Sequence, residues 1–358
     1  MAGTGTAHLR PAEDVLLRVE HMVVDFPAGG GQKVSAVADV SFDVAAGETL
    51  GLVGESGCGK STTARAVMQL PPPTGGKVVF DGREITALRG ERLRAVRPDI
   101  QIVFQDPISS LNPRRTVADI VGAPLRIWRK GGDRTKVVDE ALEAVGLDPR
   151  VARDKRPHEF SGGQCQRICV ARALVLDPKV LICDEPVSAL DVSVQAQILN
   201  LLEDLKERYQ LTLLFITHDL AVVKNVSDQV AVMYLGKICE LASPAKLYSA
   251  PAHPYTAALL SSIPVPDPSM PAGSSGLVAG DLPSPMAPPS GCRFRTRCPR
   301  AEARCASEEP QIRPTADGHF VACHFPLTGN GAGPGTSDVV DSAPGARSGP
   351  VEPEDAPA

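Results

Sequence analysis

The chain has 358 residues, of which 43% are hydrophobic, and it carries a net charge of −5 at pH 7. This length and apolar content are sufficient for two or three folded domains. The acidic balance argues against a general nucleic-acid-binding protein, which would carry excess basic residues or a basic face, so nucleic acid is not expected as a partner.

The sequence contains no run close to the about 20 consecutive apolar residues that a membrane-spanning helix requires. Its N-terminal stretch, MAGTGTAHLRPAEDV, also lacks the apolar core of a signal peptide. We therefore expect a cytoplasmic protein, in which cysteines are normally reduced. Four of the nine cysteines lie between residues 292 and 323, which indicates metal ligation rather than disulfide bonds.

The N-terminal region is expected to be rich in β-structure, after a disordered segment over residues 1–14. Strand-like alternation of apolar and polar side chains occurs over residues 15–26, 36–44 and 48–54. Glycine-containing turns separate these stretches.

Further along the chain, continuous apolar strands alternate with helices. Residues 180–184 (VLICD) and 211–217 (LTLLFIT) are predicted strands, and residues 193–209 between them are a predicted helix. Such alternation is typical of a parallel sheet covered by helices on both faces. Residues from about 110 to 160 have a mostly helical pattern, which predicts a helical lobe inserted into the sheet domain.

The C-terminal part of the chain changes composition. Residues 264–290 contain eight prolines in 27 residues and are expected to form an extended linker. Residues 291–327 then hold four cysteines. Residues 328–358 have almost no large apolar side chains and are expected to be disordered.

A phosphate-binding loop is predicted at residues 52–63, LVGESGCGKSTT. Gly54, Gly59, Lys60 and Ser61 match the pattern GxxxxGK[ST], between a strand-like run and a helix-like run. Backbone amides at a helix N-terminus bind phosphate, the lysine reaches the β- and γ-phosphates, and the serine hydroxyl ligates Mg²⁺. The amides expected to bind belong to Ser56, Gly57, Cys58, Gly59, Lys60, Ser61 and Thr62. The alternative is a glycine-rich turn with a surface lysine.

Two adjacent carboxylates, Asp184 and Glu185, end the predicted strand over residues 180–184. In open α/β sheets the ligand lies beyond the carboxyl ends of the strands, so both side chains are expected to face the phosphate-binding loop. Asp184 is a candidate Mg²⁺ ligand, and Glu185 is a candidate general base for an attacking water. Considered without the loop, the pair would more often be a loop cap.

A second anion-binding helix start is predicted in EFSGGQCQR, residues 159–167. Ser161 would cap the helix, Gly162 and Gly163 would allow close approach, and Gln164 would open the helix. An ordinary capped helix is the alternative.

Taken together, the motifs resemble an ATP-binding cassette ATPase. The resemblance rests on residues 54–62, Gln105 after IVF, SGGQ at 161–164, LICDEP at 181–186, SALD at 188–191 and His218 in FITHD. It implies an α/β P-loop NTPase with a mixed or parallel core sheet and an N-terminal antiparallel β subdomain. The nucleotide-binding domain would span residues 15–263, with an inserted helical subdomain at about 106–175. Two such cassettes would dimerise head to tail, with each ATP between the loop of one and the SGGQ of the other.

The resemblance also implies roles for single residues. Gln105 would sense Mg²⁺ and the attacking water, His218 would contact the γ-phosphate, and Asp191 would link the two sites of the dimer. Phe26 matches the position where an aromatic ring stacks on adenine, although a phenylalanine at a strand end is usually a core residue. The expected catalytic residues are Glu185, His218 and Gln105, and the expected Mg²⁺ ligands are Ser61, Gln105 and Asp184.

The C-terminal part narrows the resemblance. Residues 251–268 (PAHPYTAALLSSIPVPDP) and 291–305 (GCRFRTRCPRAEARC) resemble the extension of oligopeptide and dipeptide importer ATPases, most closely their F-type subunit. This implies ATP-driven peptide import at the cytoplasmic face of the cell membrane. The implied partners are a second ATPase subunit, a D-type companion or a second copy, with two permease subunits and, indirectly, an extracytoplasmic substrate-binding protein.

Nickel import and two functions outside transport are the alternatives to peptide import. Nickel importers share the architecture, so nickel or another small solute is the alternative cargo. A soluble cassette ATPase of repair or translation would carry a second cassette or a long coiled-coil insert, and neither is seen. Intact Lys60, Asp184, Glu185 and His218 argue against an iron–sulfur electron-transfer protein with a vestigial nucleotide site.

Cys292, Cys298, Cys305 and Cys323 have the spacing Cx5Cx6Cx17C, wider than zinc sites usually show. Related importer ATPases are associated with a [4Fe–4S] cluster at such cysteines, so the resemblance implies an iron–sulfur cluster here, with zinc and unliganded thiols as alternatives. Five interleaved arginines would offset the negative charge of the cluster: Arg293, Arg295, Arg297, Arg300 and Arg304.

The remaining cysteines are Cys58, Cys165, Cys169, Cys183 and Cys239. The last four lie in apolar contexts and are expected to be small core residues. Cys58 needs no special role within the phosphate-binding loop, and a reactive thiol of low pKa is the alternative for it.

Overall fold

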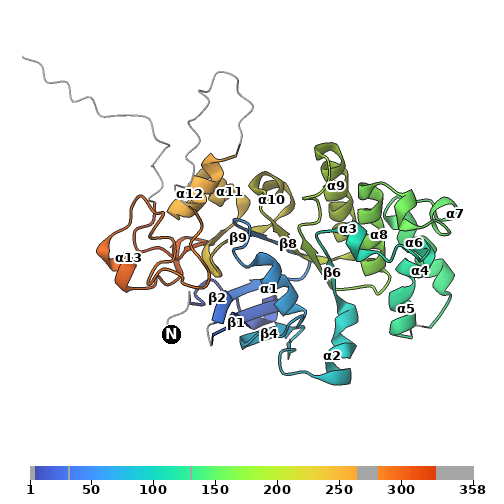
Figure 1. Cartoon of the computed structure of the whole chain (residues 1–358), viewed down its shortest axis with the longest axis horizontal. Helices are drawn as coiled ribbons and strands as arrows, with labels where there is room; N and C mark the ends of the chain where they lie inside the picture. The colour runs from blue at the N-terminus through green and yellow to red at the C-terminus, as the bar shows by residue number, and fades with distance from the viewer. Residues whose placement is uncertain (1–4, 31–32, 130, 264–280, 328–358) are drawn as a thin grey trace, which may run out of the picture.

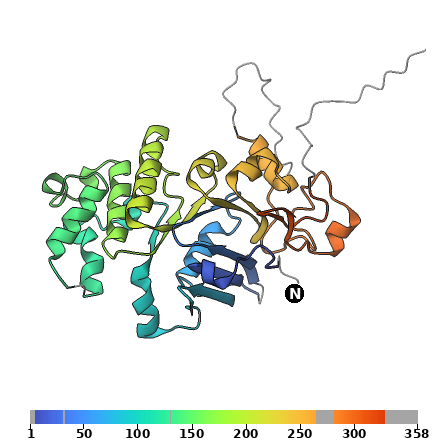
Figure 2. The same ribbon diagram turned by 180° about the vertical axis from the view of Figure 1, so that it is seen from behind.

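Two β-sheets form the framework of the chain in the computed structural model, which describes residues 5–30, 33–129, 131–263 and 281–327. Figure 1 shows the smaller sheet beside α1 (Lys60–Val67), with the larger sheet above it running toward the helices drawn in green. Figure 2 shows the same arrangement from behind.

The smaller sheet is antiparallel and has the strand order β2-β1-β4-β5. Side chains along β1 alternate between buried and partly exposed positions, with Leu17, Val19 and Val24 at most 1% exposed. This period-2 burial is what the N-terminal alternation predicts. The strands are β1 (Leu17–Pro27), β2 (Lys33–Val44), β4 (Gly75–Phe80) and β5 (Arg83–Glu84).

The larger sheet has the order β11-β12-β10-β9-β3-β8-β7-β6. Strands β9, β3, β8, β7 and β6 are parallel, whereas β10, β11 and β12 add antiparallel pairs at one edge. The predicted mixed sheet is therefore confirmed. The strands are β3 (Thr49–Val53), β6 (Ile100–Val103), β7 (Val180–Asp184), β8 (Thr212–Thr217), β9 (Gln229–Tyr234), β10 (Lys237–Ala242), β11 (Arg313–Ala316) and β12 (His319–Val321).

Helices cover the larger sheet, and a group of them projects as a lobe. Six consecutive helices of this lobe lie between Pro107 and Leu174: α3 (Pro107–Ser110), α4 (Val117–Val121), α5 (Ala123–Ile127), α6 (Arg134–Ala144), α7 (Pro149–Ala152) and α8 (Gly162–Leu174). The others are α2 (Gly90–Val96), α9 (Val192–Tyr209), α10 (Leu220–Val226), α11 (Pro244–Ser249), α12 (Pro254–Ser261) and α13 (Ala303–Ser307). Short 3-10 turns occur at Ala12–Asp14, Arg97–Asp99 and Pro157–Glu159.

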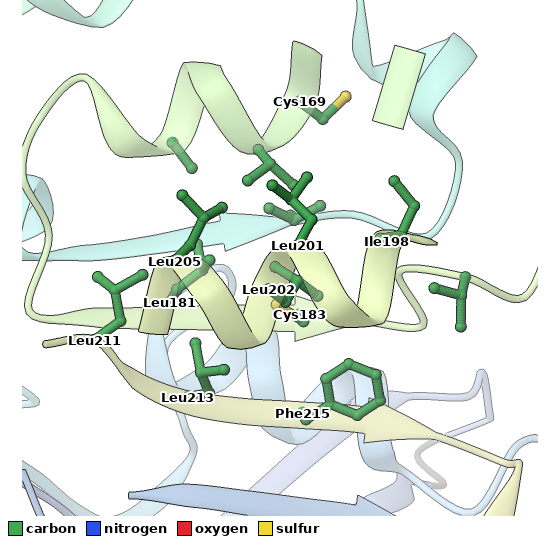
Figure 3. Close-up of a cluster of buried hydrophobic side chains, with 14 of the residues drawn as sticks. Cys169, Leu181, Cys183, Ile198, Leu201, Leu202, Leu205, Leu211, Leu213 and Phe215 are labelled. Carbon is green, nitrogen blue, oxygen red and sulfur yellow. The ribbon is translucent and has the colours of Figure 1, made fainter. Parts of the chain in front are cut away.

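The apolar face of α9 packs on the central strands. Figure 3 shows Leu202 and Leu205 of this helix above Leu181 of β7 and Leu213 and Phe215 of β8. All five side chains are at most 3% exposed. Because β7 and β8 are buried along their whole length, they provide a rigid base for residues placed at their carboxyl ends.

The cysteine-rich extension is not a separate layer. Its strand β12 pairs antiparallel with β10 from Glu240↔Val321 to Ala242↔His319. The buried Glu240 carboxylate accepts hydrogen bonds from the backbone N–H groups of Ala252 (2.7 Å) and His253 (2.8 Å), and it lies 2.7 Å from His319 Nε2. The extension is therefore joined to the rest of the chain through the core sheet.

The expected disorder over residues 1–14 is wrong for residues 5–14. His8 is 7% exposed and its Nε2 lies 2.7 Å from the Ser41 carbonyl oxygen. Arg10 pairs with Asp43 and Glu48 at 2.8 and 2.7 Å. Composition alone missed these contacts because their partners are on β2 and in the turn before β3. The predicted linker lies outside the described residues over 264–280, as does the predicted tail over 328–358.

Among the described residues, no helix has the length and apolar character needed to cross a membrane.

Candidate nucleotide-binding site

The phosphate-binding loop connects β3 to α1, as the sequence predicts. Lys60 is 4% exposed, and its Nζ donates hydrogen bonds to the carbonyl oxygens of Gly54 (2.8 Å) and Glu55 (3.0 Å). Its charge is thus held inside the curve of the loop. The first residues of α1 present backbone N–H groups there, as anion binding requires.

Glycine is required at two positions of the loop. Gly54 has a φ of 152°, and a Cβ at this residue would lie 2.1 Å from the Met233 carbonyl oxygen. Gly59 has a φ of 107°, and its Cβ would lie 2.3 Å from the Ala36 carbonyl oxygen. Both backbone conformations favour glycine. A side chain at either residue would also clash with backbone atoms of a neighbouring strand. The loop is therefore held tightly against β9 and β2.

Ser61 and Asp184 form a candidate Mg²⁺ site. The Ser61 hydroxyl donates a 2.7 Å hydrogen bond to Asp184 Oδ1, although the two residues are 123 positions apart. Asp184 is fully buried, and its Oδ2 has no hydrogen-bond partner among the described residues, with the Arg65 guanidinium 3.9 Å away. Burial raises the pKa of Asp184. An unsatisfied carboxylate oxygen beside a hydroxyl suits a hard cation such as Mg²⁺.

The three expected catalytic side chains, Gln105, Glu185 and His218, meet at the Glu185 carboxylate. Its Oε2 accepts a 2.9 Å hydrogen bond from Gln105 Nε2 and lies 3.4 Å from His218 Nδ1. Glu185 is 9% exposed, whereas the His218 side chain is about half exposed. The three residues follow β6, β7 and β8, which are neighbours in the sheet, so parallel pairing places them at one edge. This is the position where α/β sheets bind ligands.

Comparison with known proteins identifies the family. The family model "ABC transporter" matches residues 37–188, and "Oligopeptide/dipeptide transporter, C-terminal region" matches residues 239–305. The oligopeptide transport ATP-binding protein OppF of Haemophilus influenzae is 48% identical over 323 residues, covering 87% of this chain and 97% of that protein. AppF of Bacillus subtilis, also an oligopeptide transport ATP-binding protein, is 52% identical over 296 residues, covering 82% and 90%.

The chain belongs to the ABC transporter family. Among solved structures, the ATP-binding cassette MJ0796 in its dimeric, post-hydrolysis state with ADP and Pi has a TM-score of 0.58 and 29% identity. The match covers 64% of this chain and 98% of that one. The chain is thus an ABC ATPase whose cassette continues into the oligopeptide/dipeptide-type extension.

The SGGQ motif of this ABC ATPase lies away from its own phosphate-binding loop. Ser161 caps α8 and forms a capping box with Gln164, with bonds of 3.3 and 3.0 Å. A Cβ on Gly163 would lie 2.4 Å from Val194 of α9, so this helix start is packed against α9. Both views place α8 in the helical lobe, separate from α1 (Figures 1 and 2).

Two further expected binding residues lie at the surface. Asp191 precedes α9 without capping it through its side chain, and the next residue, Val192, is 82% exposed. Phe26, near the end of β1, is 38% exposed. Phe26 is therefore not a core residue, and adenine stacking stays a prediction for it.

The four cysteines of the extension line one small cavity together with His253 and Phe294. Cys292 and Cys305 are also joined by a 2.8 Å backbone hydrogen bond. Burial raises the pKa of Cys292 and Cys323 to about 11, so both are neutral thiols at pH 7 in the absence of a bound cation. In the described ranges, no group of three or more His, Cys, Asp or Glu residues is arranged closely enough to hold a metal ion.

Only some of the arginines between these cysteines line the cavity. Arg295 and Arg300 line it, whereas Arg293 donates to the Leu235 carbonyl oxygen and Arg304 pairs with Glu308 at 2.7 Å. Arg297 pairs with Glu55 of the phosphate-binding loop. Three of the five therefore have partners elsewhere, and offsetting a cluster charge stays a prediction, with Arg295 and Arg300 the two that line the cavity.

The remaining cysteines are packed in the interior, as predicted. Cys165, Cys169, Cys183 and Cys239 are at most 7% exposed. Cys58 is 1% exposed, and burial raises its pKa, which argues against the reactive thiol.

Proposed function

We propose that this ABC ATPase binds and hydrolyses ATP to energise the import of di- and oligopeptides, at the cytoplasmic face of the cell membrane. The oligopeptide transport proteins named above and the C-terminal family match support the peptide class. The partners would be a second ATPase subunit, two permease subunits and, indirectly, an extracytoplasmic substrate-binding protein. The observation that carries the hydrolytic part is the meeting of Gln105 and His218 at Glu185 Oε2.

The residues divide the chemistry between them. Lys60 would exchange its two loop carbonyls for the β- and γ-phosphate oxygens, while Ser61 and Asp184 would hold Mg²⁺. Bound Mg²⁺ neutralises charge on the phosphates. Glu185 would accept the proton of the attacking water, oriented by Gln105, and His218 would contact the γ-phosphate. Phe26 would stack on the adenine.

A second subunit would complete the site. Since α8 lies apart from α1 within one chain, its SGGQ motif, residues 161–164, would contact the nucleotide of a partner. Ser161 and Gln164 are exposed, Gly162 is half-buried, and Gly163 is buried against α9. The exposed Asp191 and Val192 lie at the neighbouring start of α9, where Asp191 would link the two sites. The partner is either a second copy or a D-type companion.

Reconstitution tests this function. The chain would be purified with its permease subunits and companion, placed in proteoliposomes, and assayed for ATP hydrolysis and uptake with peptide or Ni²⁺ as cargo. Peptide-dependent uptake that is lost in Lys60→Ala supports the proposal. Uptake of Ni²⁺ without peptide uptake would show the alternative cargo and contradict peptide import.

We also propose that Cys292, Cys298, Cys305 and Cys323 hold a [4Fe–4S] cluster. Their placement around one cavity supports this, although they are not grouped closely enough to hold a single metal ion. Cys305 is buried, and Cys292, Cys298 and Cys323 are half-buried. The cluster would supply cross-links between segments of the extension that share little apolar core. Iron and sulfide analysis after anaerobic purification tests it: four irons and four sulfides per chain are expected, whereas zinc, or neither metal, would contradict it.

A further inference from the structure

The phosphate-binding loop contains an acidic residue, Glu55, whose negative charge does not favour the binding of phosphate. Glu55 directly follows Gly54, and its carbonyl oxygen accepts the 3.0 Å hydrogen bond from Lys60. Nucleotide phosphates are strongly anionic, so an uncompensated carboxylate in this loop would oppose their binding.

Arg297 of the cysteine-rich extension neutralises this carboxylate. Its two terminal nitrogens lie 2.7 and 3.0 Å from the two carboxylate oxygens of Glu55, a bidentate pair across 242 residues of sequence. The Arg297 side chain is 7% exposed and that of Glu55 is 25% exposed, so solvent screens the pair only in part.

A buried aromatic cluster fixes the arginine and the loop together. Arg297 lies over the Tyr234 ring at 5.8 Å and donates to the Tyr234 hydroxyl at 3.4 Å. The Tyr255 hydroxyl accepts the Glu55 backbone N–H at 3.0 Å. Tyr234, Tyr255 and Phe294 pack on one another with ring centroids 4.7 to 5.3 Å apart. Glu55 is thus held through its side chain, its N–H group and its carbonyl oxygen.

We propose that Arg297 is a positioning residue for the phosphate-binding loop: it cancels the charge of Glu55 and holds the loop open to phosphate, so that the cysteine-rich extension sets nucleotide affinity. The proposal rests on the nucleotide site described above. Since Arg297 immediately precedes Cys298, which lines the four-cysteine cavity, ordering of this cavity and placement of the arginine are linked.

Nucleotide titration of the full-length chain tests this proposal. The probe is N-methylanthraniloyl-ADP with Mg²⁺, followed by fluorescence at low and high salt. Arg297→Met is expected to raise the Kd about tenfold at low salt, equivalent to about 1.4 kcal/mol, because Glu55 is left unpaired beside the phosphates. High salt should shrink this difference, since it screens the repulsion.

The rescue variant separates electrostatic positioning from a structural role. Arg297→Met combined with Glu55→Gln should return the Kd to within about twofold of wild type, because the opposing charge is gone. Arg297→Lys keeps the charge but loses the bidentate geometry, so its Kd should lie between those of wild type and Arg297→Met. Arg304→Met is the matched control, since it removes an arginine from an exposed pair with Glu308 in the same extension, and it should leave the Kd unchanged.

Each outcome decides the matter. An unchanged Kd in Arg297→Met would overturn the proposal. So would a raised Kd that is not restored when Glu55→Gln is added to Arg297→Met. If Arg297→Met fails to fold, Glu55→Gln alone is measured, and weaker binding by this variant would equally overturn it. Failure of the wild-type chain to bind the probe would instead count against the nucleotide site itself.

Discussion

Glu185→Gln is the substitution that most directly tests the arrangement at the carboxyl ends of the strands. Glutamine keeps the size of the side chain and removes its negative charge and its basicity. Its amide oxygen can still accept the 2.9 Å hydrogen bond from Gln105, so the local structure should persist. The variant should therefore bind ATP but fail to activate water.

The magnitude follows from the role of the carboxylate. A positioned general base contributes about 10² to 10⁴ in rate, which corresponds to about 3 to 5 kcal/mol of activation free energy. Because Glu185 is 9% exposed and touches both Gln105 and His218, we expect a loss toward the upper part of this range. The Kd for ATP should change by less than about threefold, since Glu185 itself is not among the residues proposed to contact the phosphates.

The assay is steady-state phosphate release by the assembled transporter, together with ATP binding measured by filter retention. Glu203→Gln is the matched control, because Glu203 is an exposed residue on α9. Its turnover should equal that of wild type. Turnover of Glu185→Gln within threefold of wild type would refute the general-base role, and loss of ATP binding would refute the separation of binding from catalysis.

Three further predictions concern stability and pH. Gly54→Ala should lower the free energy of unfolding, measured in urea, by about 3 kcal/mol, because its Cβ would meet the Met233 carbonyl oxygen. Gly57→Ala is the control: a Cβ there has nothing within 4 Å, and the loss should be about 1 kcal/mol. Equal losses in the two variants would contradict this prediction. His319→Ala should lower the free energy of unfolding by about 3 kcal/mol, because it removes a partner of the buried Glu240. His21→Ala, which breaks the exposed pair of His21 with Asp39, should lower it by under about 1 kcal/mol. Equal urea midpoints for the two variants would contradict this prediction. Burial lowers the pKa of His8 in the folded chain, so the unfolded chain binds a proton at His8 more readily. The resulting stabilisation of the folded state is fully present above about pH 6.5 and is lost as the pH falls below that value. His8→Gln should flatten that part of the urea-midpoint profile between pH 7.5 and 5, and an unchanged slope would contradict the assignment.

The placement of Gln105, Glu185 and His218 could be predicted because these residues follow neighbouring parallel strands. A glycine-rich loop after β3, carboxylates ending β7 and a histidine after β8 are local patterns, and parallel pairing brings them to one edge of the sheet. The contacts of Gln105 and His218 with Glu185 follow from this arrangement. Their catalytic roles remain predictions.

Contacts that depend on tertiary packing could not be predicted in this way. Five arginines are interleaved with the cysteines of the extension, and nothing in their spacing shows that Arg297 reaches Glu55 while Arg304 pairs locally. Likewise, His8 and Arg10 stand in a polar N-terminal stretch whose partners on β2 are visible only in the fold. Hydrophobic periodicity carries no signal for isolated polar contacts between distant segments.

The proposed site is one in which the phosphate-binding loop of one subunit and the SGGQ motif of another enclose each ATP. It is tested by the ATP hydrolysis rate per subunit, measured against protein concentration and against added companion, with the oligomeric state followed by sedimentation. We expect a rate that is low in dilute monomer and rises as dimers form. A strictly monomeric chain that hydrolyses ATP at its full rate would contradict it.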